Sequence, residues 1–416
     1  MNILHITAQK PCSTGSGVYL AKLAESMSLL QGVDRQGILA GVYADDIPDL
    51  RKALAPATLY PVVFDSPDLP FHIFGMSDVM PYPSSQYKSM TPEQYDAFTD
   101  AFLFFADKAV QDLNPDVIIC HHLYLLTAVI RKNFPEIPVF GFCHNTDLTQ
   151  FQAHDLAHDL ILSQIPELDG FFSLHDEQKN RIARVFSVPE NKIHVVGAGY
   201  DADIFNTRRT EQPDRQADSV FRMIFAGKLS RAKGVPCLLR ALQAVSAQKP
   251  ELEVSLTLTG GTGSPDEYAE IKSLADACPC PVTFTGPVYG RKLADLYRAH
   301  DCFILPSLNE GLPLCVIEAL ACGLRVIMTD LPGIRPWLEA HIKDAPISYV
   351  PVDQDPDQLQ RHLANTIMNQ AEMPRCSSEI DLSSLTWEAL AQRIYEMLRS
   401  VIAARTQNER LIYVNL

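Results

Sequence analysis

The sequence repeats one local pattern, in which a short apolar run leads into a loop with glycine and then into an amphipathic helix. The pattern occurs at 3–7, before Gly15 and Gly17, and it restarts at 222–226, before Gly227. Strands that alternate with helices in this way form a parallel sheet with helices on its faces. We therefore predict an α/β fold with two Rossmann-like domains that face each other across a cleft.

The length of the chain agrees with this division, because 416 residues exceed the size of one ordinary domain. We place an amino-terminal domain at 1–206 and a second domain at 217–384. The polar stretch at 207–219 is predicted to be a linker between them. The last segment, 385–416, is expected to contain one helix.

Composition narrows the classes of function. The chain has 35 basic and 50 acidic residues, and its net charge of −15 argues against general nucleic-acid binding. It starts in a strand-like run without the features of a signal peptide, and its apolar segments are too short to span a bilayer. Its 10 cysteines show no paired framework. We expect a cytoplasmic protein with reduced thiols; membrane association and oligomeric state stay open.

The most informative segment is 302–323. Its first four residues are predicted to be a buried strand, Pro313 is expected at the first position of a helix, and Gly323 is expected to end that helix. The first backbone N–H groups of such a helix have no partner within it, so they suit an anion or a sugar hydroxyl. The residues expected to present these groups are Gly311, Leu312 and Leu314.

Two carboxylates frame this loop, since Glu310 lies before the helix and Glu318 lies on its apolar face. Taken singly, Glu310 fits a solvated helix cap, and Glu318 fits a partner for a buried arginine. Charged residues are rarely buried unless they are paired or bind something. Together, beside a loop suited to a ligand, the two carboxylates favour a binding site.

Three cations follow the strand at 222–226, namely Lys228, Arg231 and Lys233. A solvated basic loop is one interpretation. We favour a clamp for a diphosphate, because fixed cations stabilise the negative charge that grows on a phosphate leaving group.

The first half carries weaker signals. Gly15 and Gly17 lack the third glycine and the acidic residue of a dinucleotide fingerprint, so they are weak evidence for NAD. His121, His122 and His144 each follow a predicted strand, at the edge where parallel sheets bind ligands. His144 is the favoured candidate among them for the reason given below.

Two other features of this half have competing interpretations. His154 and His158 have the spacing of zinc ligands on one helix, but no third ligand is evident, and a solvated helix face is the favoured interpretation. We therefore predict no metal site. The segment 61–92 is predicted to be a long irregular insertion, either a wall of an acceptor site or a structural lid.

The spacing of Glu310 and Glu318, with Ala-x-Ala-x-Gly ending at Gly323, resembles the signature of the retaining glycosyltransferases of family 4, which adopt the GT-B fold. The resemblance covers nearly the whole chain and is strongest over 221–335. In that family the first glutamate contacts the donor sugar and the second holds the ribose of the nucleotide. The resemblance gives these roles to Glu310 and Glu318.

Other residues of this sequence can be compared with the family's site position by position. Lys233 matches a family lysine, whereas Lys228 stands where the family has arginine, so a point charge replaces a bidentate fork. A histidine that contacts the donor sugar is usual at the position of His144. The backbone near Val288 is expected to meet the base.

The resemblance thus implies a catalytic set and a donor-binding set. The catalytic residues are His144, Glu310, Lys233 and Lys228. The donor-binding residues are Gly15, Gly17, Gly227, Lys228, Arg231, Lys233, Gly261, Val288, Glu310, Gly311, Leu312, Pro313, Leu314 and Glu318. It also implies that 1–206 binds the acceptor, that 217–384 binds the nucleotide sugar, and that the helix in 385–416 crosses back to the first domain.

The predicted function is retaining transfer of a hexose from a nucleotide sugar, with a UDP-sugar expected, to a hydroxyl acceptor of unknown identity. The product would be a glycan, a glycolipid or a small glycoside, and no cofactor or metal is expected. Three alternatives keep the fold: a nucleotide-sugar epimerase, a phosphorylase-like enzyme, and a non-catalytic sugar-nucleotide sensor. A glycoside hydrolase is disfavoured, because the three cations would have no phosphate to bind.

Overall fold

The computed structural model describes residues 1–77, 79–207, 220–353, 355–373 and 380–414, with side chains as far as residue 405. The chain divides into two compact units. Unit 1 comprises Met1–Gly199 together with the carboxyl-terminal helix from Trp387, and unit 2 comprises Tyr200–Thr386. The predicted boundary at 206 falls after this division, and the predicted linker at 207–219 lies outside the described residues apart from Thr207.

Unit 1 is built on a seven-stranded parallel sheet with the order β3-β2-β1-β6-β7-β8-β9. Its strands are β1 (Asn2–Thr7), β2 (Arg35–Tyr43), β3 (Thr58–Phe64), β6 (Val117–His121), β7 (Val139–Phe142), β8 (Gly170–Ser173) and β9 (Ile193–Val195), beside the short pair β4 (Phe74–Gly75) and β5 (Ser85–Gln86). Its helices are α1 (Gly15–Met27), α2 (Ile47–Ala53), α3 (Pro92–Leu113), α4 (Leu125–Asn133), α5 (Thr146–Ala153), α6 (His158–Gln164), α7 (Asp176–Phe186) and α14 (Trp387–Val414), with 3-10 turns η1 (Ala44–Asp46), η2 (Tyr87–Ser89), η3 (Ile165–Glu167) and η4 (Glu190–Lys192).

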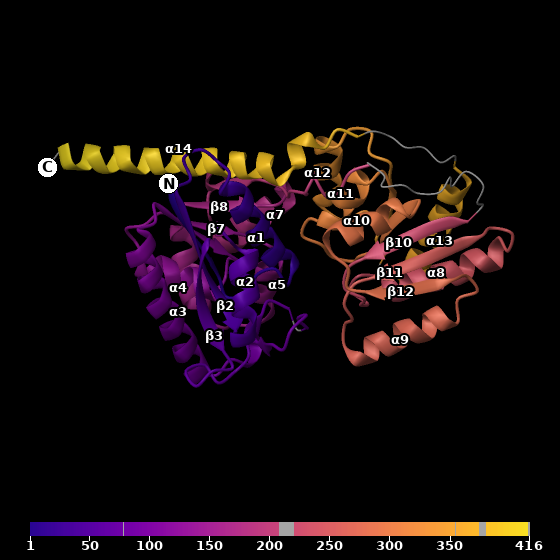
Figure 1. Cartoon of the computed structure of the whole chain (residues 1–416), viewed down its shortest axis with the longest axis horizontal. Coiled ribbons are helices and arrows are strands. Elements are labelled where there is room, and N and C mark those ends of the chain that lie inside the picture. The colour runs from indigo at the N-terminus through magenta and orange to yellow at the C-terminus, as the bar shows by residue number, and fades with distance from the viewer. Residues whose placement is uncertain (78, 208–219, 354, 374–379, 415–416) are drawn as a thin grey trace. The chain divides into compact units, whose positions relative to one another are not determined.

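Unit 2 is built on a six-stranded parallel sheet with the order β12-β11-β10-β13-β14-β15. Its strands are β10 (Phe221–Ala226), β11 (Val254–Thr259), β12 (Val282–Gly286), β13 (Cys302–Leu305), β14 (Arg325–Thr329) and β15 (Ile347–Val350). Its helices are α8 (Val235–Gln248), α9 (Pro265–Asp276), α10 (Gly290–Arg298), α11 (Leu314–Ala321), α12 (Ile334–His341) and α13 (Pro356–Glu372), with the 3-10 turn η6 (Ser383–Leu385). Helix α8 packs against α13 (Figure 1).

Helices cover both faces of the sheet in unit 1. On β2, Ile38 and Ala40 pack with Leu20 of α1, whereas Leu39 packs with Phe102 of α3. Because neighbouring residues of a strand point to opposite faces, the two sides form separate cores. The predicted α/β class with two Rossmann-like domains is confirmed.

Each sheet has a point where the strand order reverses. In unit 1 the neighbours there are β1 and β6, and in unit 2 they are β10 and β13. Loops that leave such a pair diverge, and ligands bind beyond the carboxyl ends of the strands in the crevice that results. The loops β10–α8 and β13–α11 therefore occupy the favoured ligand position of unit 2.

Three local predictions were wrong. Helix α1 begins at Gly15 rather than after Gly17, because the Thr14 hydroxyl accepts a hydrogen bond from the Gly17 N–H at 3.1 Å and caps the helix. Pro313 has an extended ψ of 103° and precedes the first residue of α11. The segment 61–92 starts within β3.

The segment 61–92 is also better packed than predicted. Phe74 lies 6.1 Å from Phe98 of α3 between ring centroids, and Tyr87 lies 5.0 Å from Tyr124. Phe74 and Tyr87 are buried in the same core cluster as Leu39. Long-range aromatic packing, which has no local sequence period, gives this segment its structure.

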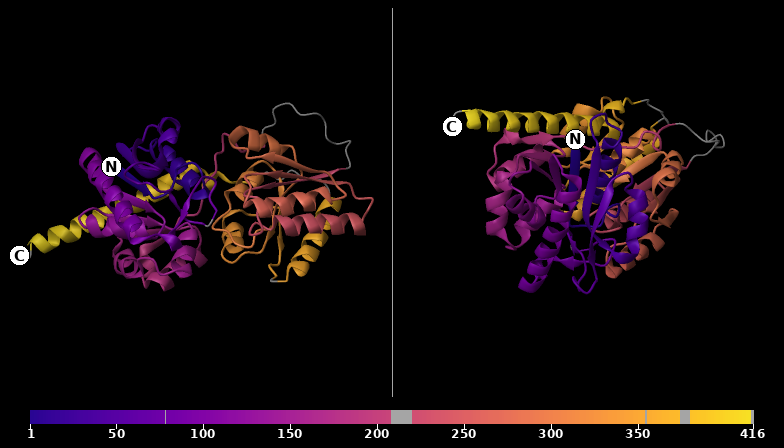
Figure 2. Two further views of the ribbon diagram at one scale, coloured as in Figure 1. Left: turned by 90° about the horizontal axis from the view of Figure 1, so that it is seen from below. Right: turned by 60° about the vertical axis from the view of Figure 1, so that its left-hand side comes forward.

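Helix α14 belongs to unit 1. It packs against α1, and Trp387 at its start meets the Tyr19 ring edge-on at 5.0 Å. It runs as one long helix to Val414, coloured yellow in Figure 1 and Figure 2, as predicted for the segment 385–416. In the described ranges no helix combines the length and apolar character needed to cross a membrane.

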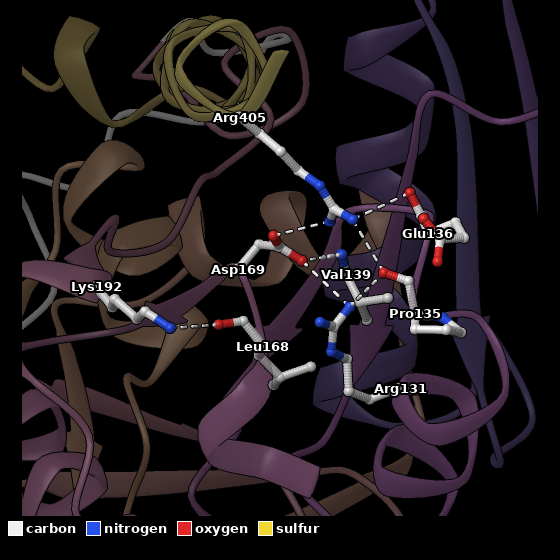
Figure 3. A network of polar contacts seen from close by, with 8 residues as sticks. All are labelled: Arg131, Pro135, Glu136, Val139, Leu168, Asp169, Lys192 and Arg405. Atoms are coloured by element: carbon white, nitrogen blue, oxygen red, sulfur yellow. Dashed lines mark hydrogen bonds and ion pairs between the residues drawn. The ribbon is translucent and has the colours of Figure 1, made fainter. Parts of the chain in front are cut away.

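A polar network holds the far part of α14 (Figure 3). Arg405 Nη1 donates to Asp169 Oδ1 at 3.0 Å, and Arg131 Nη1 lies 3.6 Å from Asp169 Oδ2. The Val139 N–H also donates to Asp169, at 2.9 Å. Arg405 Nη2 donates to the carbonyl oxygens of Pro135 and Glu136. Asp169 therefore neutralises two guanidinium groups and satisfies a strand amide at once.

We expect Asp169→Ala to lower the free energy of unfolding of unit 1 by about 3 kcal/mol, because two partly buried cations lose their counter-ion. Arg405→Ala should lower it by about 1 kcal/mol. The chain has two tryptophans, so in a Trp337→Phe background Trp387 fluorescence reports on unit 1 during denaturation with urea. Glu136→Ala is the matched control, since only its backbone carbonyl joins the network. Equal effects of Asp169→Ala and Glu136→Ala would contradict the assignment.

Candidate functional site

The loops β10–α8 and β13–α11 of unit 2 are held against each other. The Leu308 N–H donates to the Ala232 carbonyl at 3.0 Å. Gly234 has a φ of +72°, and a Cβ there would lie 2.0 Å from the Pro306 carbonyl oxygen. No other residue could accept this approach without displacing a backbone. Gly234 therefore sets the distance between the two loops.

The neighbouring loop after β11 is joined to the same group. The Leu229 N–H donates to the Gly261 carbonyl at 2.8 Å. At Gly260, where φ is +143°, a Cβ would lie 1.7 Å from the Gly227 carbonyl oxygen. The predicted donor-binding residues Gly227 and Gly261 thus lie in two loops that share backbone hydrogen bonds.

Lys233 and Glu310 meet across the first pair of loops. Lys233 Nζ lies 2.7 Å from both carboxylate oxygens of Glu310, and the side chains are 29% and 11% exposed. The two residues are distant in sequence, and they were predicted separately as a phosphate ligand and a sugar ligand. The structure brings them into one charged group beside the start of α11.

Glu318 lies on α11, the helix that follows Glu310, and is mostly shielded from solvent. Burial, with a further contribution from the charge of Asp201, raises the pKa of the Glu318 carboxyl to about 7. Among the described residues no lysine or arginine forms an ion pair with it. The interpretation of Glu318 as the partner of a buried arginine therefore finds no support in the described part of unit 2.

Arg231 is not part of the Lys233–Glu310 group. Its guanidinium Nη2 lies 2.6 Å from Glu270 Oε2 on α9, and Arg240 shares the same carboxylate at 3.1 Å. The Arg231 N–H lowers the pKa of Glu267 by a hydrogen bond, and the charges of Lys228 and Arg231 lower it further. The predicted diphosphate role of Arg231 stays a prediction, and so does that of Lys228.

A cavity of about 380 Å³ opens beside these loops. It is lined by Arg231, Arg240, Glu270, Cys237, Leu308 and Val352, among others. Lys228, Lys233, Glu310 and Glu318 are not among its lining residues. The cavity therefore lies next to the predicted donor residues rather than around them.

In unit 1 the histidines that were predicted singly form a cluster. His121 Nδ1 and His144 Nε2 are 3.1 Å apart, and the ring of His122 lies 4.9 Å from that of His144. His5, on β1, lies 6.0 Å from His121 between ring centroids. Burial lowers the pKa values of His121 and His144 well below the usual range, and neighbouring histidines lower them further. These rings are therefore neutral near pH 7.

Asp147 fixes the backbone around this cluster, and sequence reasoning missed that role. Its side chain is fully buried and accepts hydrogen bonds from the N–H groups of Leu123 and His144, at 2.8 and 3.3 Å. The Cys143 thiol donates to it at 3.3 Å. An acidic residue in the first turn of a helix was the signal available in the sequence.

The expectation that His154 and His158 lie on one helix was wrong. His154 follows the end of α5, whereas His158 begins α6, so the two do not share a helix. His158 Nε2 hydrogen-bonds the Phe151 carbonyl at 2.8 Å, and His154 Nε2 lies 3.0 Å from Gln150 Oε1. Over the described ranges, no three His, Cys, Asp or Glu side chains gather in a group suited to a metal ion.

Two family models match the chain. The model described as Glycosyltransferase Family 4 matches 62–204, and the one described as Glycosyl transferases group 1 matches 220–369. These ranges include His144, Lys233 and Glu310. The chain belongs to the family 4-like glycosyltransferases. This confirms the resemblance found in the sequence.

This family 4-like glycosyltransferase is similar to D-inositol 3-phosphate glycosyltransferases. The one from Xylanimonas cellulosilytica is 36% identical over 180 residues, which cover 40% of this chain and 42% of that protein. The one from Corynebacterium jeikeium is 24% identical over 339 residues, which cover 77% and 76%. The match thus spans less than half the length of the first of these relatives.

Solved glycosyltransferases share the fold. The structure of Anabaena HepE in complex with UDP-glucose superposes with a TM-score of 0.63 and 16% identity, over 98% of this chain and 100% of that chain. At this identity the likeness concerns the fold alone, and it confirms the predicted GT-B class.

The histidine cluster predicts acid sensitivity of unit 1. Burial lowers the pKa of His5 to about 4, and a hydrogen bond to Gln36 offsets this only in part. Below pH 6.5 the histidine is protonated in the unfolded chain, whereas folded His5 stays neutral. The free energy of unfolding therefore decreases as the pH falls from 6.5 to 4. In the Trp337→Phe background we expect wild type to lose about 3 kcal/mol more than His5→Phe over this range. His362→Gln, on α13, is the control. Parallel pH profiles of wild type and His5→Phe would refute the prediction.

Glu318 predicts the opposite pH dependence in unit 2. Because its folded pKa is raised, stability is lost as the pH rises from about 4.5 through 7. We expect Glu318→Gln to raise the free energy of unfolding of unit 2 by about 1–2 kcal/mol at pH 8, with no gain at pH 5. Trp337 fluorescence in a Trp387→Phe background measures the unfolding of unit 2.

Glu310→Gln is the control, because it removes the partner of Lys233 and should destabilise unit 2. A stabilising effect of Glu310→Gln, or no effect of Glu318→Gln at pH 8, would argue against this electrostatic account.

Proposed function

We propose that this glycosyltransferase moves a hexose from a nucleotide sugar, with UDP-glucose as the first donor to test, to a hydroxyl acceptor with retention of anomeric configuration. The observation that supports this most directly is the Lys233–Glu310 pair in unit 2. It places a cation and a carboxylate side by side, next to the start of α11 and beyond the ends of β10 and β13. A pyrophosphate needs a cation, and the hydroxyls of the sugar joined to it need a hydrogen-bond acceptor nearby, so the pair offers both groups at neighbouring positions.

In this proposal Lys233 and Lys228 bind the phosphates, and Glu310 accepts hydrogen bonds from hydroxyls of the transferred sugar. The bond between the anomeric carbon and the phosphate oxygen breaks, and negative charge grows on the departing nucleotide. The lysines stabilise that charge more than they stabilise the bound donor, which lowers the barrier. Glu318 accepts hydrogen bonds from the ribose hydroxyls. Burial and the charge of Asp201 raise the pKa of its carboxyl, and hydroxyl donors of a bound ribose would favour the ionised form.

The acceptor oxygen forms the new bond on the face from which the nucleotide leaves, and its proton passes to the departing phosphate. No side chain of the described chain is assigned as a covalent nucleophile, and no metal is assigned a step. His144 of unit 1 is proposed to contact the transferred sugar. The names of the relatives support a polyol as the acceptor class, and the complex of HepE supports a UDP-sugar as donor. The described cysteines are free thiols, which supports a reducing, cytoplasmic location.

A first experiment identifies the donor by thermal shift. UDP-, GDP- and ADP-glucose are compared, because a ligand of the folded state raises its melting temperature. Release of the nucleotide is then measured with myo-inositol and its monophosphates as acceptors, in the presence of EDTA. NMR of the product gives the anomeric configuration, and an epimerised sugar formed without acceptor would favour the epimerase alternative.

We expect Lys233→Met to lower kcat/KM for the donor by about 10²-fold or more, because the charge that meets the leaving group is lost. Lys249→Met is the matched control. Lys249 also forms an ion pair with a glutamate of unit 2, Glu372, but this pair lies where α8 and α13 end, away from the loop that carries Lys233. Turnover by Lys233→Met within threefold of wild type, or an equal loss in Lys249→Met, would overturn the assignment of the donor site.

A further inference from the structure

The ring of His144 is held in one plane by its neighbours. It stacks on Phe142 at 4.9 Å with an interplanar angle of 16°, and it lies nearly parallel to the ring of His121, with 5.4 Å between centroids and an angle of 13°. Tyr19 meets it edge-on at 5.6 Å. With the backbone of His144 also held by Asp147, the protonation state of the two ring nitrogens is the remaining variable.

The contact between His121 Nδ1 and His144 Nε2 allows two arrangements. Both rings are neutral, so one nitrogen donates and the other accepts. If His121 donates, His144 carries its proton on Nδ1. If His144 donates, His121 must carry its own proton on Nε2. The choice determines whether His144 offers a hydrogen-bond donor or an acceptor at its second nitrogen.

The surroundings of His121 distinguish these arrangements. His121 is 4% exposed, and its Nε2 is buried without a hydrogen-bond partner among the described residues. A buried N–H without a partner is much rarer in proteins than a buried acceptor whose lone pair is unused. A proton on His121 Nε2 is therefore disfavoured, and a proton on His121 Nδ1, pointing at His144, is favoured.

His5 does not reverse this preference. The Gln36 side-chain amide donates through Nε2 to the Ala24 carbonyl at 2.8 Å, so its Oε1 accepts from His5 Nε2 at 3.1 Å. His5 thus carries its proton on Nε2. Its Nδ1, like His121 Nε2, has no hydrogen-bond partner among the described residues, so the two rings are not hydrogen-bonded to each other.

We propose that His121 is a positioning residue that holds His144 in the tautomer with its proton on Nδ1, so that His144 presents an N–H donor to the substrate. The contact of His144 with the sugar rests on the proposed function. In this state His144 donates a hydrogen bond to a hydroxyl oxygen, and its Nε2 lone pair is already engaged. His144 therefore orients the substrate and does not act as the general base, which agrees with proton transfer to the departing phosphate.

The tautomer is measured directly on the full chain labelled with ¹⁵N-histidine. Two-bond couplings between ring protons and nitrogens identify which nitrogen is protonated, and His144→Gln assigns the signals of His144. We expect protonated Nδ1 and bare Nε2 in the wild type at pH 7.5. A wild-type His144 with its proton on Nε2 would overturn the inference without any need for a variant.

Variants test the dependence on His121. His121→Phe keeps an aromatic ring and removes the donor, so the Nδ1–H form of His144 should lose its dominance, whereas the amide of His121→Asn can replace the Nδ1 donor and should restore it. His122→Asn is the matched control, because asparagine tolerates the backbone φ of 75° there and the ring contact carries no hydrogen bond. It should leave the tautomer unchanged. An unchanged tautomer in His121→Phe would refute the role of His121.

Kinetics separate this inference from the proposed function. If transfer is found, kcat should fall at least tenfold in His121→Phe, with little change in KM for the donor, and should recover in His121→Asn. A loss that is equal in both variants would show that His121 acts by packing alone and would overturn its positioning role. If no donor is turned over but the tautomer depends on His121 as expected, the proposed function fails and the assignment of the tautomer stands.

Discussion

The ion pair between Lys233 and Glu310 depends on how closely two loops of unit 2 approach each other. Gly234 lies so near the Pro306 carbonyl that a Cβ would not fit, and the Leu308 amide closes the contact with a hydrogen bond to Ala232. A small displacement of either loop would separate the cation from the carboxylate. The chemistry proposed for unit 2 thus follows from one close backbone contact at the point where the strand order reverses.

The two units treat buried ionisable groups differently. Unit 2 keeps a charged pair and a desolvated carboxylate, Glu318, at its proposed donor site. Unit 1 keeps a cluster of histidines that burial holds neutral. Glu318 and the buried histidines each reduce stability over part of the pH range, and such groups are typical of functional sites. In the proposed function, unit 2 stabilises the charge of the leaving group and unit 1 supplies directed hydrogen bonds.

Prediction from sequence succeeded where short-range patterns determine the structure. The strand Cys302–Leu305 was predicted with its observed bounds, because a run of four buried apolar residues before a proline and glycine loop leaves few alternatives. It failed at 61–92, where Phe74 and Tyr87 are ordered by contacts with α3 and Tyr124 rather than by a local period. It also misplaced the start of α1, because Thr14 forms the cap and Gly15 and Gly17 fit inside the first turn.

The sequence by itself determined the α/β class, the two Rossmann-like domains, the family, and the identity of Lys233, Glu310, Glu318 and His144 as candidates. Only the tertiary structure decided which of them meet. It joined Lys233 rather than Arg231 to Glu310, gave Arg231 to Glu270, and placed His121 against His144. The physical reason is that these contacts link different strand–helix loops. Their distances depend on the order and register of the sheet strands, which no local pattern of residues encodes.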